Sequence, residues 1–357
     1  METDNGKKKT YAPPLRFPGF TGEWEERRLG EVCTIGNGRD YKHLTKGDIP
    51  VFGTGGYMTS VNDYLYDGET TFIGRKGTIN KPFYYKGKFW TVDTLFYTHL
   101  FNGVTPRFVY CIFQTINWLR YNEASGVPSL SKDAIEKIKV HIPHIEEQQK
   151  ISKLLFALDE RIAVQRALIG EMGRLMKGIR NEVFGILVEK GGFNAKIGDV
   201  LNYEQPQQYL VEDTEYTKEG TPVLTANKAF VLGYTSETFG VYQKGDCIIF
   251  DDFTLDCKYV DFPFKVKSSA IKILSAKDKE LLRYVFEFLK YLDLSTDEHK
   301  RHYITETQNQ SLILPSNHKI GLIAHTFSAL SLQMEYAVSE RIKMEEQKQY
   351  LLRKMFI

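Results

Sequence analysis

Two long stretches of the chain place apolar side chains at alternating steps of four and three residues. The first stretch runs from Ile151 to Val183, and Gln165 is its one polar member. This spacing is a heptad seam, which is narrower than the apolar stripe of an ordinary surface helix and needs one partner helix. The apolar members of the first seam are Ile151, Leu155, Leu158, Ile162, Ile169, Met172, Met176, Ile179 and Val183.

Proline and glycine bound this first seam. Pro143 cannot lie inside a helix, and Gly191-Gly192 would end one. A helix from Ile145 to Phe184 would be about 60 Å long. The pattern therefore predicts a single long rod in the middle of the chain.

The second seam lies near the C-terminus and repeats the first. Adding 172 to each position gives ten residues, eight of them apolar, and maps Pro143 onto Pro315. An upstream repeat, at an offset of 168, relates Arg28–Val32 to Lys196–Val200. One seam alone would be typical of a dimerisation helix, whereas two copies in one chain indicate two fused units, each a globular part followed by a long helix. The second seam consists of Ile323, Phe327, Leu330, Met334, Ala337, Arg341, Met344, Lys348, Leu351 and Met355.

The globular parts combine strand and helix patterns. Segments rich in Phe, Tyr, Thr, Val and Ile alternate with glycine turns such as Gly53–Tyr57, which is typical of short strands. Residues 107–121 and 279–292 have helical spacing. We expect an α+β fold with a loose arm at 1–14, a first domain at 15–143, a first long helix at 144–190, a second domain at 191–315 and a second long helix at 316–357.

Composition limits the class of protein. The chain has 357 residues, of which 42% are hydrophobic, enough for two domains with their own cores. It has no apolar run of membrane-spanning length and no apolar signal region at its N-terminus, and its four cysteines lack Cys-x-x-Cys spacing. We therefore expect a cytoplasmic protein with reduced thiols. Its net charge of +2 means that any basic binding surface must be local.

The sequence shows no catalytic motif. It has no Gly-x-x-x-x-Gly-Lys-Ser/Thr loop and no Gly-x-Gly-x-x-Gly after a strand. His141 and His144 lack partners at metal-ligand spacing. Asp256-Cys257-Lys258 with Asp251 could form half of a nuclease motif, but the first unit has no acid there, so turn residues are the better interpretation. We predict no catalytic centre, no metal and no cofactor bound by this chain.

Polar residues on glycine-rich turns offer recognition chemistry instead. Arginine, lysine and backbone N–H groups can contact phosphate, while arginine suits guanine and asparagine or glutamine suits adenine. Arg75, Asn37 and Asn80 are therefore candidates for reading base edges, although any one of them could be a solvated turn residue. The candidate DNA contacts are Asn37, Arg39, Tyr57, Arg75, Lys76, Asn80, Lys81 and Ser129 in the first unit, and Asn227, Lys228, Asp252, Thr254, Lys258, Lys300, Arg301 and Gln308 in the second.

Six motifs follow one another along the chain: Pro14–Phe20, Gly53–Tyr57, Gly74–Thr78, Trp90–Leu95, Gly126–Ser131 and Glu146–Ile151. In this order they resemble the specificity (S) subunit of type I restriction–modification systems. The second unit departs from it, with Asp251–Thr254 in place of Gly-Arg-Lys-Gly and Lys300–Tyr303 in place of Gly-Val-Pro-Ser.

The resemblance implies a mechanism. Each globular unit would be a target-recognition domain that grips one half of a split double-stranded DNA site. The two long helices would pair as an antiparallel coiled coil with pseudo-two-fold symmetry, leaving an unread spacer of about half to one turn of DNA.

The partners that the resemblance implies are two modification subunits, which carry S-adenosylmethionine and methylate adenine, and restriction subunits that use ATP and Mg²⁺ to translocate and cleave. The chain itself would catalyse nothing. Two other interpretations stay open: a stand-alone DNA-modifying enzyme, and a coiled-coil scaffold that binds proteins or carbohydrate.

Overall fold

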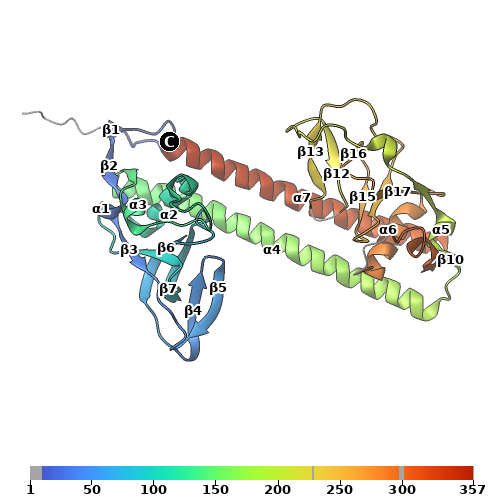
Figure 1. Ribbon diagram of the computed structural model, residues 1–357, viewed down its shortest axis with the longest axis horizontal. Helices are drawn as coiled ribbons and strands as arrows, with labels where there is room; N and C mark the ends of the chain where they lie inside the picture. Colours follow the sequence, from blue (N-terminus) through green and yellow to red (C-terminus); the bar gives the residue numbers. More distant parts are fainter. Residues whose placement is uncertain (1–9, 227–228, 297–300, 357) are drawn as a thin grey trace, which may run out of the picture. The chain divides into compact units, whose positions relative to one another are not determined.

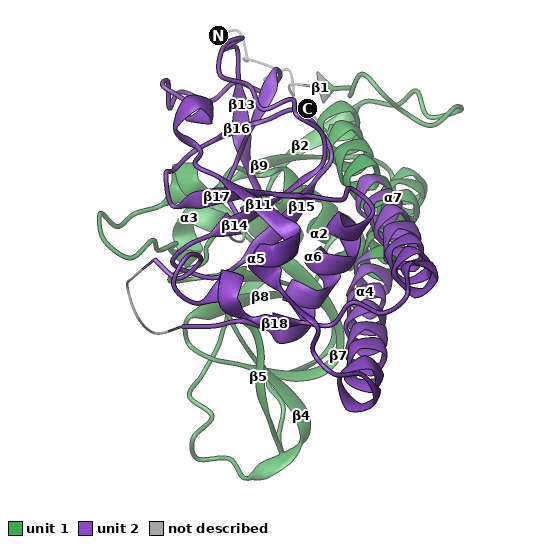
Figure 2. Ribbon diagram, turned by 90° about the vertical axis from the view of Figure 1, so that its right-hand side faces the viewer, with its two compact units in different colours: residues 1–165, 340–357 green, residues 166–339 purple. Residues whose placement is uncertain are grey.

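The computed structural model describes residues 10–226, 229–296 and 301–356. The chain divides into two compact units (Figures 1 and 2), one formed by the residues up to Gln165 together with those from Glu340 onward, and the other by Arg166–Ser339. We call them unit 1 and unit 2. Three candidate contacts, Asn227, Lys228 and Lys300, lie outside the described residues, as do residues 1–9 of the predicted arm.

Unit 1 is built on a six-stranded sheet with strand order β3-β8-β6-β7-β4-β5. Neighbouring strands are antiparallel except β4 and β7, which are parallel. The strands are β3 (Thr34–Asn37), β4 (Lys46–Gly53), β5 (Gly56–Val61), β6 (Tyr66–Gly74), β7 (Phe83–Thr91) and β8 (Leu95–His99). The predicted helix at 107–121 is divided into α2 (Pro106–Thr115) and a 3₁₀ turn (Trp118–Tyr121), because the backbone of Ile116 is extended.

A second, three-stranded sheet in unit 1 has the order β1-β2-β9. Its strands are β1 (Thr10–Tyr11), β2 (Trp24–Arg28) and β9 (Lys139–Ile142), and the short helices α1 (Leu29–Val32) and α3 (Lys132–Glu136) adjoin it in sequence. The described end of the predicted loose arm is thus a strand paired with β2, and the ring of Tyr11 stacks on His141 with centroids 4.4 Å apart. The expectation of a loose arm is wrong for these two residues because the sheet edge holds them.

Unit 2 repeats this plan with a different sequence. Its main sheet has the order β11-β17-β14-β15, and a three-stranded sheet has the order β13-β12-β16. The strands are β10 (Ala195–Lys196), β11 (Leu201–Glu204), β12 (Thr221–Leu224), β13 (Val231–Thr235), β14 (Cys247–Asp251), β15 (Cys257–Val260), β16 (Lys265–Val266), β17 (Ile271–Ala276) and β18 (Ser311–Leu312). The helices are α5 (Ile197–Val200) and α6 (Leu281–Leu292), with 3₁₀ turns at Gln207–Tyr209 and Thr307–Asn309.

The duplication is visible in local detail as well as in strand order. The carboxylate of Glu31 accepts a hydrogen bond from the Arg28 N–H at the start of α1 (3.1 Å). The carboxylate of Asp199 accepts one from the Lys196 N–H at the start of α5 (2.8 Å). An acid at the third helical position reaches back to the N-cap in both cases, as in a capping box. The sequence repeat at an offset of 168 therefore marks the same local structure, and the expected α+β fold is confirmed.

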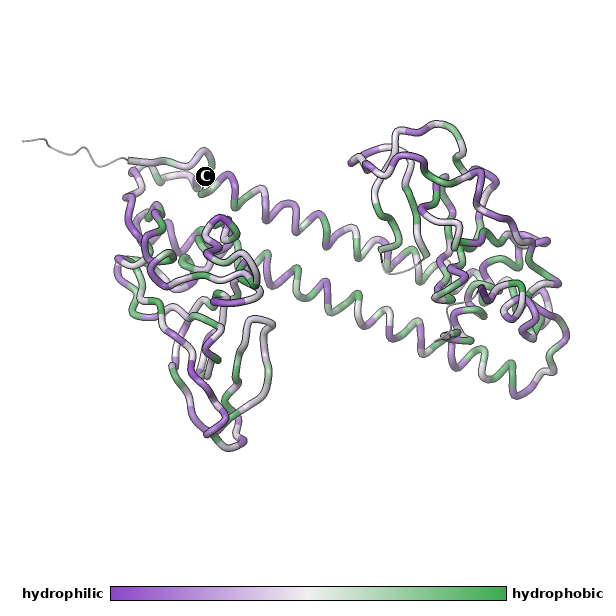
Figure 3. Tube along the Cα trace, in the orientation of Figure 1, coloured by the Kyte–Doolittle hydropathy of each residue, from purple (hydrophilic) through white to green (hydrophobic). Residues whose placement is uncertain are grey.

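The long helices are α4 (Ile145–Lys190) and α7 (Asn317–Phe356). Hydrophobic and polar residues alternate along both (Figure 3). Every one of the twenty seam positions is buried or half-buried, including the polar Gln165, Arg341 and Lys348. The helices therefore bury the narrow faces that the sequence predicts.

Contacts inside unit 2 give the direction of the pairing. The guanidinium of Arg180 lies 5.3 Å from the centroid of the Phe327 ring, and a Cβ atom added to Gly173 would lie 3.7 Å from the Met334 methyl group. Seven residues back along α4 therefore correspond to seven residues forward along α7, so the pairing is antiparallel. Inside unit 1, Lys348 contacts Asp159 in the same register. The prediction of an antiparallel helix pair is confirmed.

The predicted domain boundaries differ from the limits of the two compact units, and they stay a prediction.

Each unit packs its core onto both long helices. In unit 1, Trp24 and Phe108 on the globular side share a cluster with Leu155 of α4 and Leu352 of α7. In unit 2, Phe288 of α6 shares a cluster with Phe184 of α4 and Ile320 of α7. The globular parts are therefore anchored to the helices by continuous apolar cores. No helix in the described part of the chain could span a membrane.

Candidate nucleic-acid interface

Three loops of unit 1 meet at one corner of its main sheet. The Arg75 N–H donates to the Thr94 carbonyl (2.7 Å), and the Leu130 N–H donates to the Arg75 carbonyl (2.9 Å). The Gly77 N–H donates to the Pro128 carbonyl (2.9 Å). The loop after β6 is thus held by main-chain hydrogen bonds between the loop before β8 and the loop before α3.

A cavity of about 530 Å³ opens at this corner. Four candidate contacts from separate parts of the sequence line it: Asn37, Arg75, Lys76 and Ser129. The guanidinium of Arg75 lies 6.0 Å from the centroid of the Phe96 ring, in cation–π range, and one of its N–H groups points to the Asp93 carbonyl (3.4 Å). The ring and the carbonyl orient a cation that is still exposed to solvent.

The corner also contains residues that the sequence analysis missed. Phe96, Glu123 and Lys132 line the cavity. Lys132 follows the Gly126–Ser131 motif directly, so its position next to a recognised loop could have identified it. The strand residue Phe96 carries no comparable signal, because only the sheet register brings it beside Arg75.

The other candidates in unit 1 are exposed but lie outside this cavity. They are Arg39, Tyr57, Asn80 and Lys81. The backbone of Arg39 is fixed, since its N–H donates to the Thr91 carbonyl (2.8 Å) and its carbonyl accepts from the Trp90 indole N–H (2.9 Å). Tyr57 is 64% exposed on β5, and its hydroxyl shares a hydrogen bond with Ser60 (3.1 Å). These side chains could extend a contact surface beyond the corner.

The candidate residues of unit 2 have different environments from those of unit 1, and Asp252 is the clearest case. Asp252 is buried, and one carboxylate oxygen accepts hydrogen bonds from the N–H groups of His302 (3.0 Å) and Tyr303 (2.7 Å). The other oxygen lies 3.6 Å from the buried ammonium of Lys272. The expectation that Asp252 contacts DNA directly does not fit this environment; its carboxylate holds the segment after Arg301 in place.

The remaining described candidates of unit 2 do not form one cluster. Thr254 and Arg301 are exposed, whereas Lys258 and Gln308 are half-buried. The Gln308 amide donates to the Ile304 carbonyl (2.6 Å), so it closes a local turn. Lys258 lines a different cavity, of about 440 Å³, together with Arg283. Among these four candidates, Arg301 is the one cation that is exposed.

The cysteine thiols and the carboxylate of Asp251 have structural environments. Within the described ranges no group of three His, Cys, Asp or Glu side chains could hold a metal ion. Burial raises the pKa of Cys33, Cys111 and Cys247 to about 12 and that of Cys257 to about 11, so these thiols are protonated at neutral pH. The carboxylate of Asp251 accepts hydrogen bonds from the N–H groups of Phe253 (2.9 Å) and Thr254 (3.0 Å), as expected for a turn residue.

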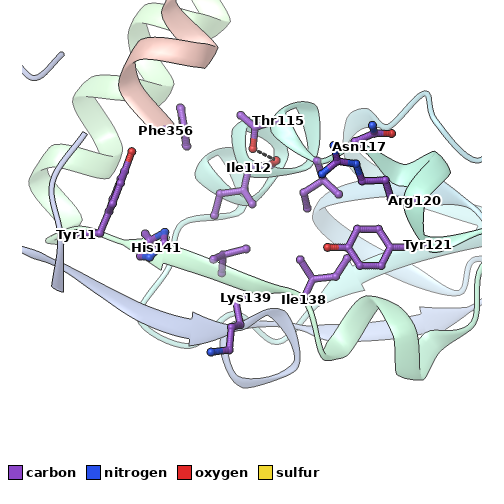
Figure 4. Close-up of a pocket in the computed structure, with 12 residues that line it drawn as sticks. Tyr11, Ile112, Thr115, Asn117, Arg120, Tyr121, Ile138, Lys139, His141 and Phe356 are labelled. Carbon is purple, nitrogen blue, oxygen red and sulfur yellow. Dashed lines mark hydrogen bonds between the residues drawn. The ribbon is translucent and has the colours of Figure 1, made fainter. Parts of the chain in front are cut away.

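A second cavity of unit 1, of about 370 Å³, is shown in Figure 4. His141 and Tyr11 lie stacked in its wall, and burial lowers the pKa of His141 below its ordinary value. The hydroxyl of Thr115 donates to the Ile112 carbonyl (2.8 Å), and none of the residues that line the cavity is acidic. None of the candidate contacts lies in the wall of this cavity.

The chain is similar in sequence to proteins of one class. Residues 21–172 match the family described as the type I restriction modification DNA specificity domain. The type I restriction enzyme EcoR124I/EcoR124II specificity subunit of Escherichia coli is 46% identical over 126 residues, which cover 33% of this chain and 31% of that protein. The EcoprrI specificity subunit of Escherichia coli is 24% identical over 156 residues, covering 41% and 38%. The matched segment spans about a third of the length of these curated relatives.

The fold is shared over the whole chain. The crystal structure of the type I restriction–modification S subunit from M. genitalium has a TM-score of 0.72 at 15% identity, covering 97% of this chain and 99% of that one. The described chain thus has two α+β units, and each of them packs its core onto the two antiparallel long helices. Over these segments the chain is similar to the specificity subunits of type I restriction–modification systems, and residues 21–172 match their DNA specificity domain.

Proposed function

We propose that this chain is the DNA-reading subunit of a type I restriction–modification complex and that each unit reads one half of a split double-stranded site. The observation that carries the proposal is the corner of unit 1, where main-chain hydrogen bonds gather Asn37, Arg75, Lys76 and Ser129 around one cavity. An amide and two cations on a rigid rim can contact base edges and phosphates together.

In this proposal the helix pair sets the distance between the two readers. α4 has 46 residues, which gives a length of about 69 Å, or roughly two turns of B-DNA. With part of each helix buried in a unit, the unread spacer would be about half to one turn. The spacer length would then follow from the number of heptads between the units.

The chemistry would lie in other subunits. Two modification subunits would bind S-adenosylmethionine and methylate adenine, and restriction subunits would use ATP and Mg²⁺ to translocate and cleave. This chain would select the sequence without catalysing a step, in the cytoplasm. Incubating the isolated chain with S-adenosylmethionine and DNA tests the alternative of a stand-alone enzyme, since methyl transfer without the partner subunits would contradict our proposal.

The alternative of a protein-binding or carbohydrate-binding scaffold is tested by a gel shift on the reconstituted complex over a range of salt. Phosphate contacts release counterions, so DNA affinity must fall steeply as salt rises. A scaffold would show no such sequence-selective, salt-dependent shift.

Replacing Arg75 with alanine should impair recognition of one half-site only. The guanidinium lies at the corner of unit 1, and loss of a bidentate contact to a base costs about 1–3 kcal/mol. Competition binding with DNA altered in either half-site measures this directly. Equal loss of discrimination at both halves would contradict the model of two separate readers.

Replacing Lys76 with glutamine should weaken DNA binding by a similar factor for all sequences. A lysine that contacts phosphate carries no sequence information, and its loss should reduce the slope of log K against log salt by about 1. Lys139→Gln is a matched control, because that exposed lysine lies on β9 and pairs with Glu26. A changed base preference in the Lys76 variant would instead assign the side chain to base reading.

A further inference from the structure

The sheet registers of the two units make their corners comparable residue by residue. In unit 1, Phe96 of β8 is paired with Ile73 on one side and with Asn37 on the other. In unit 2, Lys272 of β17 is paired with Phe250 on one side. On the other side Glu204 is paired with Ile273, which places the next residue, Gln205, beside Lys272. Asn37 and Gln205 therefore occupy equivalent positions, as do Phe96 and Lys272.

The loops confirm this register. The Arg75 N–H donates to the Thr94 carbonyl, and the Asp252 N–H donates to the Ala270 carbonyl (3.0 Å), one residue beyond the strand pairs in each case. The Arg75 carbonyl accepts from the Leu130 N–H, and the Asp252 carbonyl accepts from the His302 N–H (3.2 Å). Arg75 thus corresponds to Asp252, and Ser129, which precedes Leu130, corresponds to Arg301.

At three of these four positions the two units carry side chains of different chemical type. In unit 1 the loop residue is the cation Arg75, which lies over the strand residue Phe96. In unit 2 the loop residue is the anion Asp252, buried against the strand cation Lys272. Burial lowers the pKa of Lys272, the positive charge of Arg301 adds to this, and the charge of Asp252 opposes it. In unit 1 an exposed cation of the corner, Arg75, lies in the loop after β6, whereas in unit 2 the exposed cation is Arg301.

The fourth position has kept its chemistry. Asn37 and Gln205 both carry a primary amide, and both are exposed at the end of the first strand of their sheets. In unit 2 the Lys272 ammonium donates to the Gln205 amide oxygen (3.4 Å), and that oxygen has a second lone pair free for a ligand. An amide has therefore been retained at a corner where the neighbouring charges have been rearranged.

We propose that Asn37 and Gln205 are the paired base-reading residues of the two units, each recognising an adenine in the major groove. The amide N–H₂ donates to adenine N7 and the amide oxygen accepts from the N6 amino group, a bidentate match that the other bases do not offer. Arg75 in unit 1 and Arg301 in unit 2 then contact a neighbouring nucleotide, each from a different loop of its corner. The inference rests on the proposed function, because it needs a complex that reads a split site.

The test uses the full chain reconstituted with its modification subunits on a library of randomised DNA, with methylated sequences recovered and sequenced. Asn37→Ala should relax discrimination at one A·T pair of one half-site by about tenfold to a hundredfold. Gln205→Ala should do the same at one A·T pair of the other half-site. Asn202→Ala is the matched control, because Asn202 is an exposed amide on β11, the strand that ends just before Gln205. This variant should recognise both half-sites as the wild type does.

Three results would overturn the assignment while leaving the proposed function intact. They are relaxation at a G·C pair, uniform weakening at all sequences, and an unchanged site in either variant. If the wild-type complex modifies no split site, the proposed function fails and the assignment fails with it. Because both side chains are exposed, the variants should fold as the wild type does, which circular dichroism verifies before the library is read.

Discussion

Inserting one heptad into each long helix will move the two halves of the recognised DNA site about three base pairs apart. Duplicating Arg166–Met172 in α4 and Glu335–Arg341 in α7 adds matched segments of the antiparallel pair, because the observed contacts place these ranges opposite each other. Seven residues add about 10 Å of helix, against about 3.4 Å per base pair. A seven-residue insertion also keeps the seam facing its partner, so the pairing survives.

The measurement is methylation of DNA duplexes that carry the wild-type half-sites with spacers of increasing length. The variant should lose the wild-type spacing by more than a hundredfold and gain the longer one, since a misplaced half-site forfeits several contacts of 1–3 kcal/mol each. A duplication in α4 alone is the control, because it leaves the two helices unequal and should favour neither spacer. An unchanged spacer preference in the double insertion would show that the helices do not set the distance between the two half-sites.

Replacing Glu287 with alanine will destabilise unit 2 by about 3–5 kcal/mol. The side chain of Glu287 on α6 is fully buried, with one carboxylate oxygen 2.7 Å from Arg180 of α4 and the other 2.8 Å from Arg283. Arg283 continues the network to the Phe327 carbonyl of α7 (3.0 Å). Removing the anion leaves two largely buried guanidinium groups facing each other without a counter-charge, where α6 meets both long helices.

Native-state hydrogen exchange of the full chain reports this loss, because it resolves the amides of α6 from those of α2. The amides of α6 should exchange faster in the variant, while those of α2 in unit 1 keep their protection. Glu171→Ala is the control: Glu171 pairs with Arg174 at the surface of α4, where such a pair contributes about 0–1 kcal/mol. Equal protection of α6 in the Glu287 variant and the wild type would show that the network does not anchor the unit.

The helices were predictable because a heptad seam is a local signal. The steps of four and three residues identify which side chains share a face of the helix. Gln165 and Arg341 are half-buried and Lys348 is buried, so the period is informative even where the residue type is polar. The duplication could be predicted from the same heptad pattern. The strand order could not be predicted from it, because pairing between segments such as β7 and β4 depends on contacts between residues distant in sequence.

That the candidate residues lie close together was predictable in unit 1 and less so in unit 2. Residues on glycine-rich turns, such as Arg75 and Lys76, do lie together at the corner. Asp252 looked equally suitable from its turn, but the N–H groups of His302 and Tyr303, fifty residues away, bury its carboxylate. Gln205 could not be identified from composition or spacing, because its equivalence to Asn37 exists only in the register of two sheets.

The most direct measurement is selection of DNA by the wild-type chain reconstituted with its modification subunits, followed by sequencing of the bound fragments. We predict two short blocks of fixed sequence separated by a gap of constant length and no sequence preference, one block for each unit. A single continuous block, or binding without any sequence preference, would contradict the account of two readers held apart by a helix pair.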